Sequence, residues 1–221
     1  MEQHSLSFQY SARYFTLGSL NSDTKAIWFV LHGYGQLAEY FIKKFQVLAN
    51  YNIYVIAPEG LSRFYLEQID PKTGRANDRV GATWMTKENR LMDIENYINY
   101  LSGIYKKEVG TSSVPVTILG FSQGAATASR WLLSNQIRFN RLVLWAGVFP
   151  SDMNFVSGKK TFEEKEVTFV YGTADPFLTD KKFNEMQKLA SEISASINEI
   201  AFEGGHEIDR ATLLKLIQPY D

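Results

Sequence analysis

Short, nearly continuous apolar runs recur along the chain, separated by segments of helical character. The runs occupy residues 25–33, 52–60, 114–122, 141–147, 166–175 and 196–205. Runs of this length with little polar alternation are typical of strands that are buried on both faces of a parallel sheet. The pattern therefore predicts a mostly parallel central sheet.

The segments between the runs supply helices that would cover such a sheet. Leu91, Ile94, Ile98, Leu101 and Tyr105 are spaced by three and four residues, which places them on one helical face. Further helices are predicted near residues 37–48, 123–135, 180–193 and 207–218. Residues 5–18 alternate imperfectly and are predicted to form one or two antiparallel edge strands. The alternation indicates one α/β domain over residues 1–221, with helices flanking the sheet.

Glycines and polar residues gather directly after four of the predicted strands. These loops read LHGYGQ (31–36), GFSQG (120–124), GTADP (172–176) and EGGHE (203–207). In open α/β sheets, ligands bind beyond the carboxyl ends of the strands. We therefore expect the chemistry of the protein at this edge of the sheet.

The loop at 120–124 places Ser122 between two glycines, where a strand gives way to a helix. The pattern G-x-S-x-G is typical of a sharp turn that holds a nucleophilic serine above the sheet. A glycine-rich turn in which Ser122 only caps the helix would show the same letters. A serine hydroxyl is a poor nucleophile without a base, so histidine decides between the two interpretations.

Chain order separates the three histidines. One lies near the N-terminus, His32 precedes Ser122, and His206 follows the last apolar run. Around a nucleophilic G-x-S-x-G turn the chain order is serine, acid, histidine, which favours His206 as the base. Asp175, three residues after the run VTFVYG and before a proline, is the first choice for the acid, and Asp152 is the second.

The charge that develops on the substrate oxygen requires hydrogen-bond donors. We expect them to be the backbone N–H of Gln123, directly after the serine, and that of Tyr34, which glycines flank in the loop LHGYGQ. His32 is interpreted as a residue that fixes this loop.

The segments LHGYGQ, GFSQGAA, GTADPF and GGHEI together resemble the motifs of the alpha/beta-hydrolase fold. Within that fold, they are similar to the phospholipase/carboxylesterase group, which contains the acyl-protein thioesterases, and the likeness covers almost the whole chain. The resemblance implies a compact serine esterase without a large cap domain. It assigns Ser122 as nucleophile, Asp175 as acid and His206 as base, with the N–H groups of Tyr34 and Gln123 as the oxyanion hole.

The resemblance implies hydrolysis of carboxylic esters or thioesters through an acyl-enzyme. A carboxylesterase acting on small or medium acyl esters is our first expectation, and a lysophospholipase or acyl-protein thioesterase is the alternative. A non-catalytic ligand-binding protein that keeps the fold is a second alternative. Acyl transfer to an acceptor other than water would use the same residues.

Substrate specificity is expected in the long loop over about residues 59–90, because long loops inside a compact domain are usually functional. The candidate residues for the wall of a substrate pocket are Arg63, Phe64, Tyr65, Trp84 and Met85. The same apolar side chains would equally pack the loop onto the sheet, and Arg63 would equally pair with Glu59.

Composition narrows the classes of partner and site. The chain has 221 residues, no cysteine and a net charge of −1, which excludes disulfides and gives no sign of a nucleic-acid partner. No metal-binding motif stands out, and neither a metal nor a cofactor is expected. No apolar run approaches the ~20 residues that span a bilayer, and we find no signal-peptide pattern. We expect a cytoplasmic enzyme for a small-molecule ester, without stable membrane insertion; the oligomeric state stays open, a homodimer included.

Overall fold

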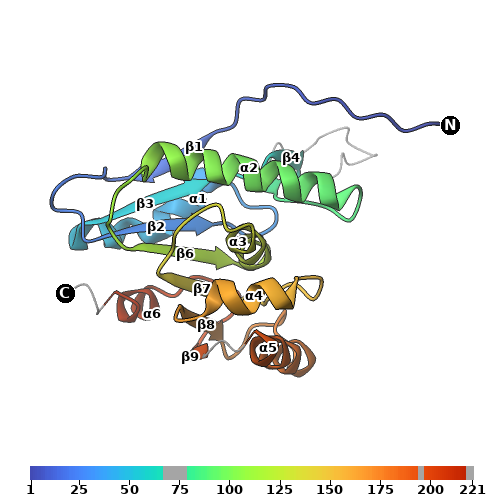
Figure 1. The fold of residues 1–221 in the computed structure, drawn as a ribbon. Helices are drawn as coiled ribbons and strands as arrows, with labels where there is room; N and C mark the ends of the chain where they lie inside the picture. Colours follow the sequence, from blue (N-terminus) through green and yellow to red (C-terminus); the bar gives the residue numbers. More distant parts are fainter. Residues whose placement is uncertain (67–78, 194–196, 218–221) are drawn as a thin grey trace, which may run out of the picture.

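The computed structural model describes residues 1–66, 79–193 and 197–217, and a seven-stranded sheet forms its centre (Figure 1). The strand order is β1-β3-β2-β6-β7-β8-β9. The strands are β1 (Tyr14–Leu17), β2 (Ala26–Leu31), β3 (Ile53–Pro58), β6 (Val116–Phe121), β7 (Arg141–Trp145), β8 (Glu166–Gly172) and β9 (Ile197–Phe202). All neighbours are parallel except β1, which pairs antiparallel with β3. The predicted mostly parallel sheet is confirmed.

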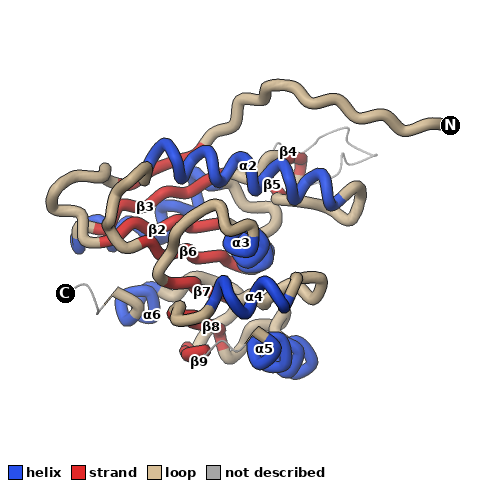
Figure 2. The backbone as a smooth tube through the Cα atoms, viewed as in Figure 1, coloured by secondary structure: helices blue, strands red, loops and turns tan. Residues whose placement is uncertain are grey.

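Helices flank the sheet (Figures 1 and 2). They are α1 (Ala38–Phe41), the 3-10 helix η1 (Ile42–Tyr51), α2 (Arg90–Glu108), α3 (Gln123–Leu133), α4 (Phe155–Phe162), α5 (Asp180–Glu192) and α6 (Arg210–Lys215). Strand β2 shows how both faces are buried. Phe29 belongs to a core cluster with Trp131 of α3, whereas its neighbour Trp28 belongs to a second cluster with Phe45 of η1. Successive side chains of a strand point to opposite faces, so β2 contributes to both cores.

The first half of the predicted N-terminal strand region is irregular. Only β1 forms within residues 5–18, and residues 1–13 have no regular secondary structure and extend from the body of the protein (Figure 1). Leu6 and Phe8 are 86% and 76% exposed. A strand needs a face on which to bury its apolar side chains, and these two side chains have none.

Three other segments differ in detail from the prediction. The region 37–48 is divided between the short α1 and the longer 3-10 helix η1. The expected loop at 59–90 contains a two-stranded antiparallel sheet of β4 (Ser62–Tyr65) and β5 (Val80–Thr83). Helix α4 was not predicted, because its sequence FVSGKKTF is short and lacks a clear helical spacing of apolar residues. Within the described ranges, no helix has the length and apolar character that crossing a membrane requires.

Candidate active site

Ser122 lies at the turn between β6 and α3 in a backbone conformation that non-glycine residues rarely adopt. Its φ is 54° and its ψ is −115°. It precedes the first residue of α3, yet its side chain makes no capping hydrogen bond to the helix. The interpretation of Ser122 as an ordinary helix cap therefore fails. A strained backbone that persists beside a cleft is characteristic of a functional position.

The glycines around Ser122 are required by close packing of the backbone. A Cβ atom on Gly120 would lie 2.2 Å from the carbonyl oxygen of Gly124, and a Cβ on Gly124 would lie 2.2 Å from that of Leu31. Real Cβ atoms do not approach carbonyl oxygens this closely. The turn after β6 is thus pressed against the end of β2, which fixes the position of Ser122.

His206 and Asp175 form the one histidine–carboxylate pair at this edge among the described residues. Nδ1 of His206 donates to Oδ2 of Asp175 across 2.7 Å. The Asp175 carboxylate is fully buried, whereas the His206 side chain is 20% exposed. Because Asp175 occupies Nδ1, the Nε2 atom is the ring nitrogen left for the cleft.

The surroundings hold this pair in place from two sides. The backbone N–H of Phe177 donates to Oδ1 of Asp175 over 2.8 Å, so both carboxylate oxygens accept a hydrogen bond. The imidazole of His206 contacts two aromatic rings, with centroid distances of 4.9 Å to Phe121 and 4.8 Å to Phe177. Both phenylalanines belong to the segments GFSQGAA and GTADPF, but the sequence predicts no role for their rings, because it does not show which side chains pack on the imidazole.

Asp152, the second choice for the acid, lies elsewhere. Its carboxylate pairs with Arg90 and, at 2.7 Å, with Arg130. These partners join α2 and α3 to the segment after β7. Asp152 therefore links elements of the scaffold and does not contact His206.

His32 is buried and acts on the loop that follows β2. Its Nδ1 donates to the carbonyl of Gly33 (2.8 Å), and its Nε2 accepts from the N–H of Gly60 (2.9 Å). The imidazole is fully buried, and burial lowers the pKa of His32 to about 4. This neutral ring joins two loops and is not available as a second base.

The two backbone N–H groups expected to bind an oxyanion are unoccupied within the described chain. Neither the N–H of Tyr34 nor that of Gln123 donates to a backbone carbonyl there. The neighbouring N–H of Gly33 is held by Oε1 of Gln36 (2.9 Å), and that of Gly35 by the carbonyl of Ala82 (2.9 Å). The loop is therefore fixed on both sides of Tyr34.

The segment at the end of β5 braces both of these donors. While β5 fixes the Tyr34 loop through Ala82, the side chain of Gln123 accepts from the N–H of Trp84 (3.2 Å) and donates to the carbonyl of Met85 (3.0 Å). It also hydrogen-bonds to the hydroxyl of Thr83. The sequence does not predict this role of β5, because most of its contacts come from backbone groups of residues 82–85, which any side chains would allow.

Ser122 and His206 open into one cleft of about 380 Å³. Its apolar wall comes from Val148, Phe149 and Pro150 after β7 and from Phe177 and Leu178 after β8. Lys182 and Glu185 of α5 add two charged side chains. A cleft of this size, mostly apolar with a few polar groups, suits a small organic substrate.

The five predicted pocket residues do not line this cleft within the described part of the chain. Trp84 is 1% exposed, stacks on His32 and donates its indole N–H to the carbonyl of His32 (2.8 Å). Met85 packs against the core and its sulfur lies 3.5 Å from Arg130. For these two residues the packing interpretation holds and the prediction of a pocket wall is wrong.

The other three belong to β4 and stay outside the cleft. Arg63 lies 3.9 Å from the carboxylate of Glu59, the pairing that the sequence left open. The ring of Phe64 packs against Tyr34, with 5.1 Å between centroids, and Tyr65 is 68% exposed. Phe64 therefore supports the loop that carries a candidate oxyanion donor.

Among the described residues, no three histidine, cysteine or carboxylate side chains lie close enough to hold a metal ion. The arrangement instead offers a strained serine, a histidine oriented by a buried carboxylate, and two unoccupied backbone donors. These are the parts that nucleophilic catalysis by serine requires.

Comparison with known proteins gives the fold a wider context. The model of the family described as Serine hydrolase (FSH1) matches residues 22–213. No curated protein sequence matches the chain.

Solved structures share the architecture at low sequence identity. Zea mays acyl-protein thioesterase 2 matches with a TM-score of 0.69 and 14% identity, over 95% of this chain and 99% of that chain. The Bacillus cereus carboxylesterase gives 0.65 and 14%, over 95% and 93% of the two chains. The phospholipase/carboxylesterase from Dyadobacter fermentans gives 0.64 and 17%, over 96% and 97%. The predicted alpha/beta-hydrolase fold is confirmed.

Proposed function

Because the chain belongs to the FSH1 family of serine hydrolases, we propose that it cleaves carboxylic esters through an acyl-enzyme on Ser122. The observation that carries the proposal is that Ser122 and His206 open into one cleft, while the buried carboxylate of Asp175 holds Nδ1 of His206 from behind. We assign His206 as the general base and Asp175 as the residue that orients it. The oxyanion hole is assigned to the N–H groups of Tyr34 and Gln123.

The proposed reaction has two halves. The Ser122 hydroxyl attacks the ester carbonyl while Nε2 of His206 takes its proton, and the oxyanion receives hydrogen bonds from the two backbone N–H groups. His206 then protonates the departing alcohol, which leaves the acyl group on Ser122. A water molecule, deprotonated by His206, attacks the acyl-enzyme, and the acid is released as the serine regains its proton.

Esters of small or medium acyl chains are the proposed substrates. The apolar wall of the cleft around Val148 and Leu178 suits an acyl chain, and its volume of about 380 Å³ matches a small organic substrate. The structurally similar plant protein is an acyl-protein thioesterase, and long-chain thioesters are the alternative substrates. A cytoplasmic location and the choice of water as acceptor remain predictions from the sequence.

The decisive experiment is hydrolysis of p-nitrophenyl esters, from acetate to palmitate, by the wild type and Ser122→Ala. Turnover should fall by roughly 10⁴- to 10⁶-fold in the variant, and its circular dichroism spectrum should be unchanged. Val148→Trp should move the optimum to shorter chains, whereas Tyr65→Ala, outside the cleft, should not. Wild-type turnover in the folded Ser122→Ala variant would refute the proposal.

A further inference from the structure

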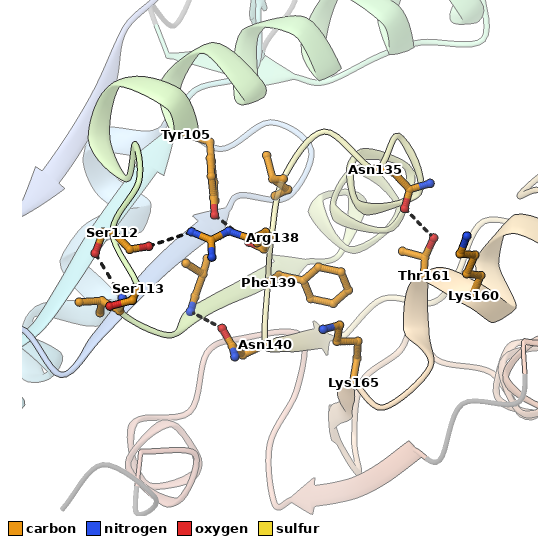
Figure 3. A pocket seen from close by; sticks show the side chains of 13 residues that line it. Tyr105, Ser112, Ser113, Asn135, Arg138, Phe139, Asn140, Lys160, Thr161 and Lys165 are labelled. Atoms are coloured by element: carbon orange, nitrogen blue, oxygen red, sulfur yellow. Dashed lines mark hydrogen bonds between the residues drawn. The ribbon is translucent and has the colours of Figure 1, made fainter.

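A second and larger cavity lies at the end of the sheet where the strands begin, opposite the end that carries Ser122. It measures about 660 Å³, and its lining includes Val116, the first residue of β6, and Asn140, directly before β7 (Figure 3). Ser122 follows the other end of β6. Six residue steps of ~3.3 Å along a strand place the two sites about 20 Å apart. The cavity is therefore separate from the proposed esterase site.

Three cationic side chains from three different segments line this cavity. They are Arg138 in the loop before β7, Lys160 in α4 and Lys165 in the turn before β8. Its described lining contains no aspartate or glutamate. Glu166, the neighbour of Lys165, is instead paired with Arg141 at 2.8 Å.

No carboxylate in the described ranges forms an ion pair with any of the three cations. Positive charges that share a concave surface repel one another, and a low-dielectric wall strengthens their field within it. An anionic ligand would relieve this repulsion. The positive charge of the cavity therefore indicates a negatively charged ligand.

Arg138 is held in place by contacts that leave most of its donors open. Its Nη2 donates to the carbonyl of Ser112 (3.1 Å), and its backbone carbonyl accepts from the hydroxyl of Tyr105 (2.9 Å). Figure 3 shows its guanidinium next to Ser112, with the Tyr105 side chain reaching toward Arg138 from α2. A guanidinium has five N–H donors in a fork that matches phosphate and carboxylate groups. The side chain of Arg138 contacts the Ser112 carbonyl and the Tyr105 hydroxyl, which orients its remaining donors in advance.

The remaining lining adds neutral groups and one aromatic wall. The amine of Lys165 lies 5.5 Å from the ring centre of Phe139. Asn135 and Thr161 are joined by a hydrogen bond of 3.0 Å at the side where Lys160 lies (Figure 3). The cavity volume is within the ~300–1,000 Å³ typical of small-molecule sites. These contacts describe a polar site with room for more than a single inorganic ion.

We propose that this cavity binds a small organic polyanion through Arg138, Lys160 and Lys165. A ligand with two or more phosphate groups or carboxylates would match three cations that come from separate segments. Phosphate and carboxylate each offer a pair of acceptor oxygens that the guanidinium of Arg138 can bind with two parallel hydrogen bonds, so experiment must separate them.

The test is isothermal titration calorimetry of the full chain with tripolyphosphate and, separately, with citrate. The wild type should bind one equivalent of at least one of them, more weakly as NaCl is raised. The relative affinities identify the group that the site prefers. Arg138→Gln should weaken binding at least about tenfold, since a charge-assisted hydrogen bond contributes that much.

Adjacent lysines of α4 supply a matched control. Lys160→Gln should weaken binding severalfold, whereas Lys159→Gln, an exposed lysine outside the described cavity lining, should leave it unchanged. All three variants should keep the esterase turnover and the melting temperature of the wild type. The proposal is overturned if neither anion binds at low ionic strength. It is equally overturned if Lys159→Gln lowers the affinity as much as Lys160→Gln.

Discussion

A Cβ atom placed on Gly147 would lie 2.4 Å from the carbonyl oxygen of Ser122. The same atom would lie 2.6 Å from the Cβ of Ala125, which is buried in α3. The Ser122 carbonyl is itself fixed, because it accepts the N–H of Ala125 (3.0 Å). The segment after β7 is therefore in direct contact with the turn that carries the proposed nucleophile, and it has no space for a larger residue.

Gly147→Ala should lower both activity and stability. The added methyl must displace the backbone of Ser122, and displacements of about 1 Å at a reacting group cost about 100-fold in rate. Overpacking should also lower the free energy of unfolding by about 1–3 kcal/mol. The measurements are kcat/KM on a p-nitrophenyl ester and urea denaturation. Gly103→Ala is the control: a Cβ there meets nothing within 4 Å, in the middle of α2, and should stabilise slightly. A fully active Gly147→Ala would contradict the packing argument.

Ser122→Gly and Ser122→Ala should both be inactive but should differ in stability. The φ of 54° is strained for alanine, and glycine adopts it freely. We expect the glycine variant to unfold with a free energy about 1 kcal/mol higher than that of the alanine variant, although glycine normally destabilises ordered backbone. Chemical denaturation of the two proteins side by side measures the difference. Greater stability of the alanine variant would show that the turn is unstrained.

Asp175→Asn should reduce kcat by about 10³- to 10⁴-fold with little change in KM. Oδ1 would keep its bond from the N–H of Phe177, so the new amide group would face Nδ1 of His206. The imidazole would then carry its proton on Nε2 and could not accept one from Ser122. Steady-state kinetics on one ester measures the effect. Asp152→Asn, which alters the contacts with Arg90 and Arg130, should keep a kcat within a few-fold of the wild type. A large loss of kcat in Asp152→Asn together with an active Asp175→Asn would identify Asp152 as the acid instead.

His32 should make the stability of the protein fall in mild acid. Burial lowers its pKa from 6.5 to about 4, so between these values the unfolded chain binds a proton that the folded chain excludes. Stability therefore decreases as the pH falls through this range, by about 3 kcal/mol in total. Urea denaturation at several pH values should show a shallower dependence for His32→Asn than for the wild type. Parallel curves for the two proteins would mean that His32 does not cause the loss.

The sequence predicted the sheet and the Asp175–His206 contact for the same reason. Both residues follow strands, β8 and β9, that are parallel neighbours, so their loops emerge at one edge. The strained turn at Ser122 could also be predicted from the sequence, because the two flanking glycines stand where backbone segments pack too closely for a side chain.

The cleft wall could not be predicted in this way. Val148 and Leu178 belong to loops without a motif that would mark them as part of a binding site, and only the folded structure brings them close to Ser122. Trp84 shows the opposite error: a large aromatic residue in a long loop suggested a pocket, but its indole N–H finds its acceptor at His32 in the interior. Burial of an aromatic residue depends on partners distant in sequence, which a local pattern does not contain.

The proposed nucleophile and base follow strands that differ in the number of neighbouring strands to which they are hydrogen-bonded. Ser122 follows β6, which has neighbours on both sides, whereas His206 follows β9, which is paired only with β8 in the described sheet. A strand with a neighbour on one side only has fewer contacts to hold it, and regions with fewer contacts open locally at a lower free energy. Heating should therefore disconnect the proton acceptor from the serine before the sheet melts, so inactivation at moderate temperature would be reversible and would precede global unfolding.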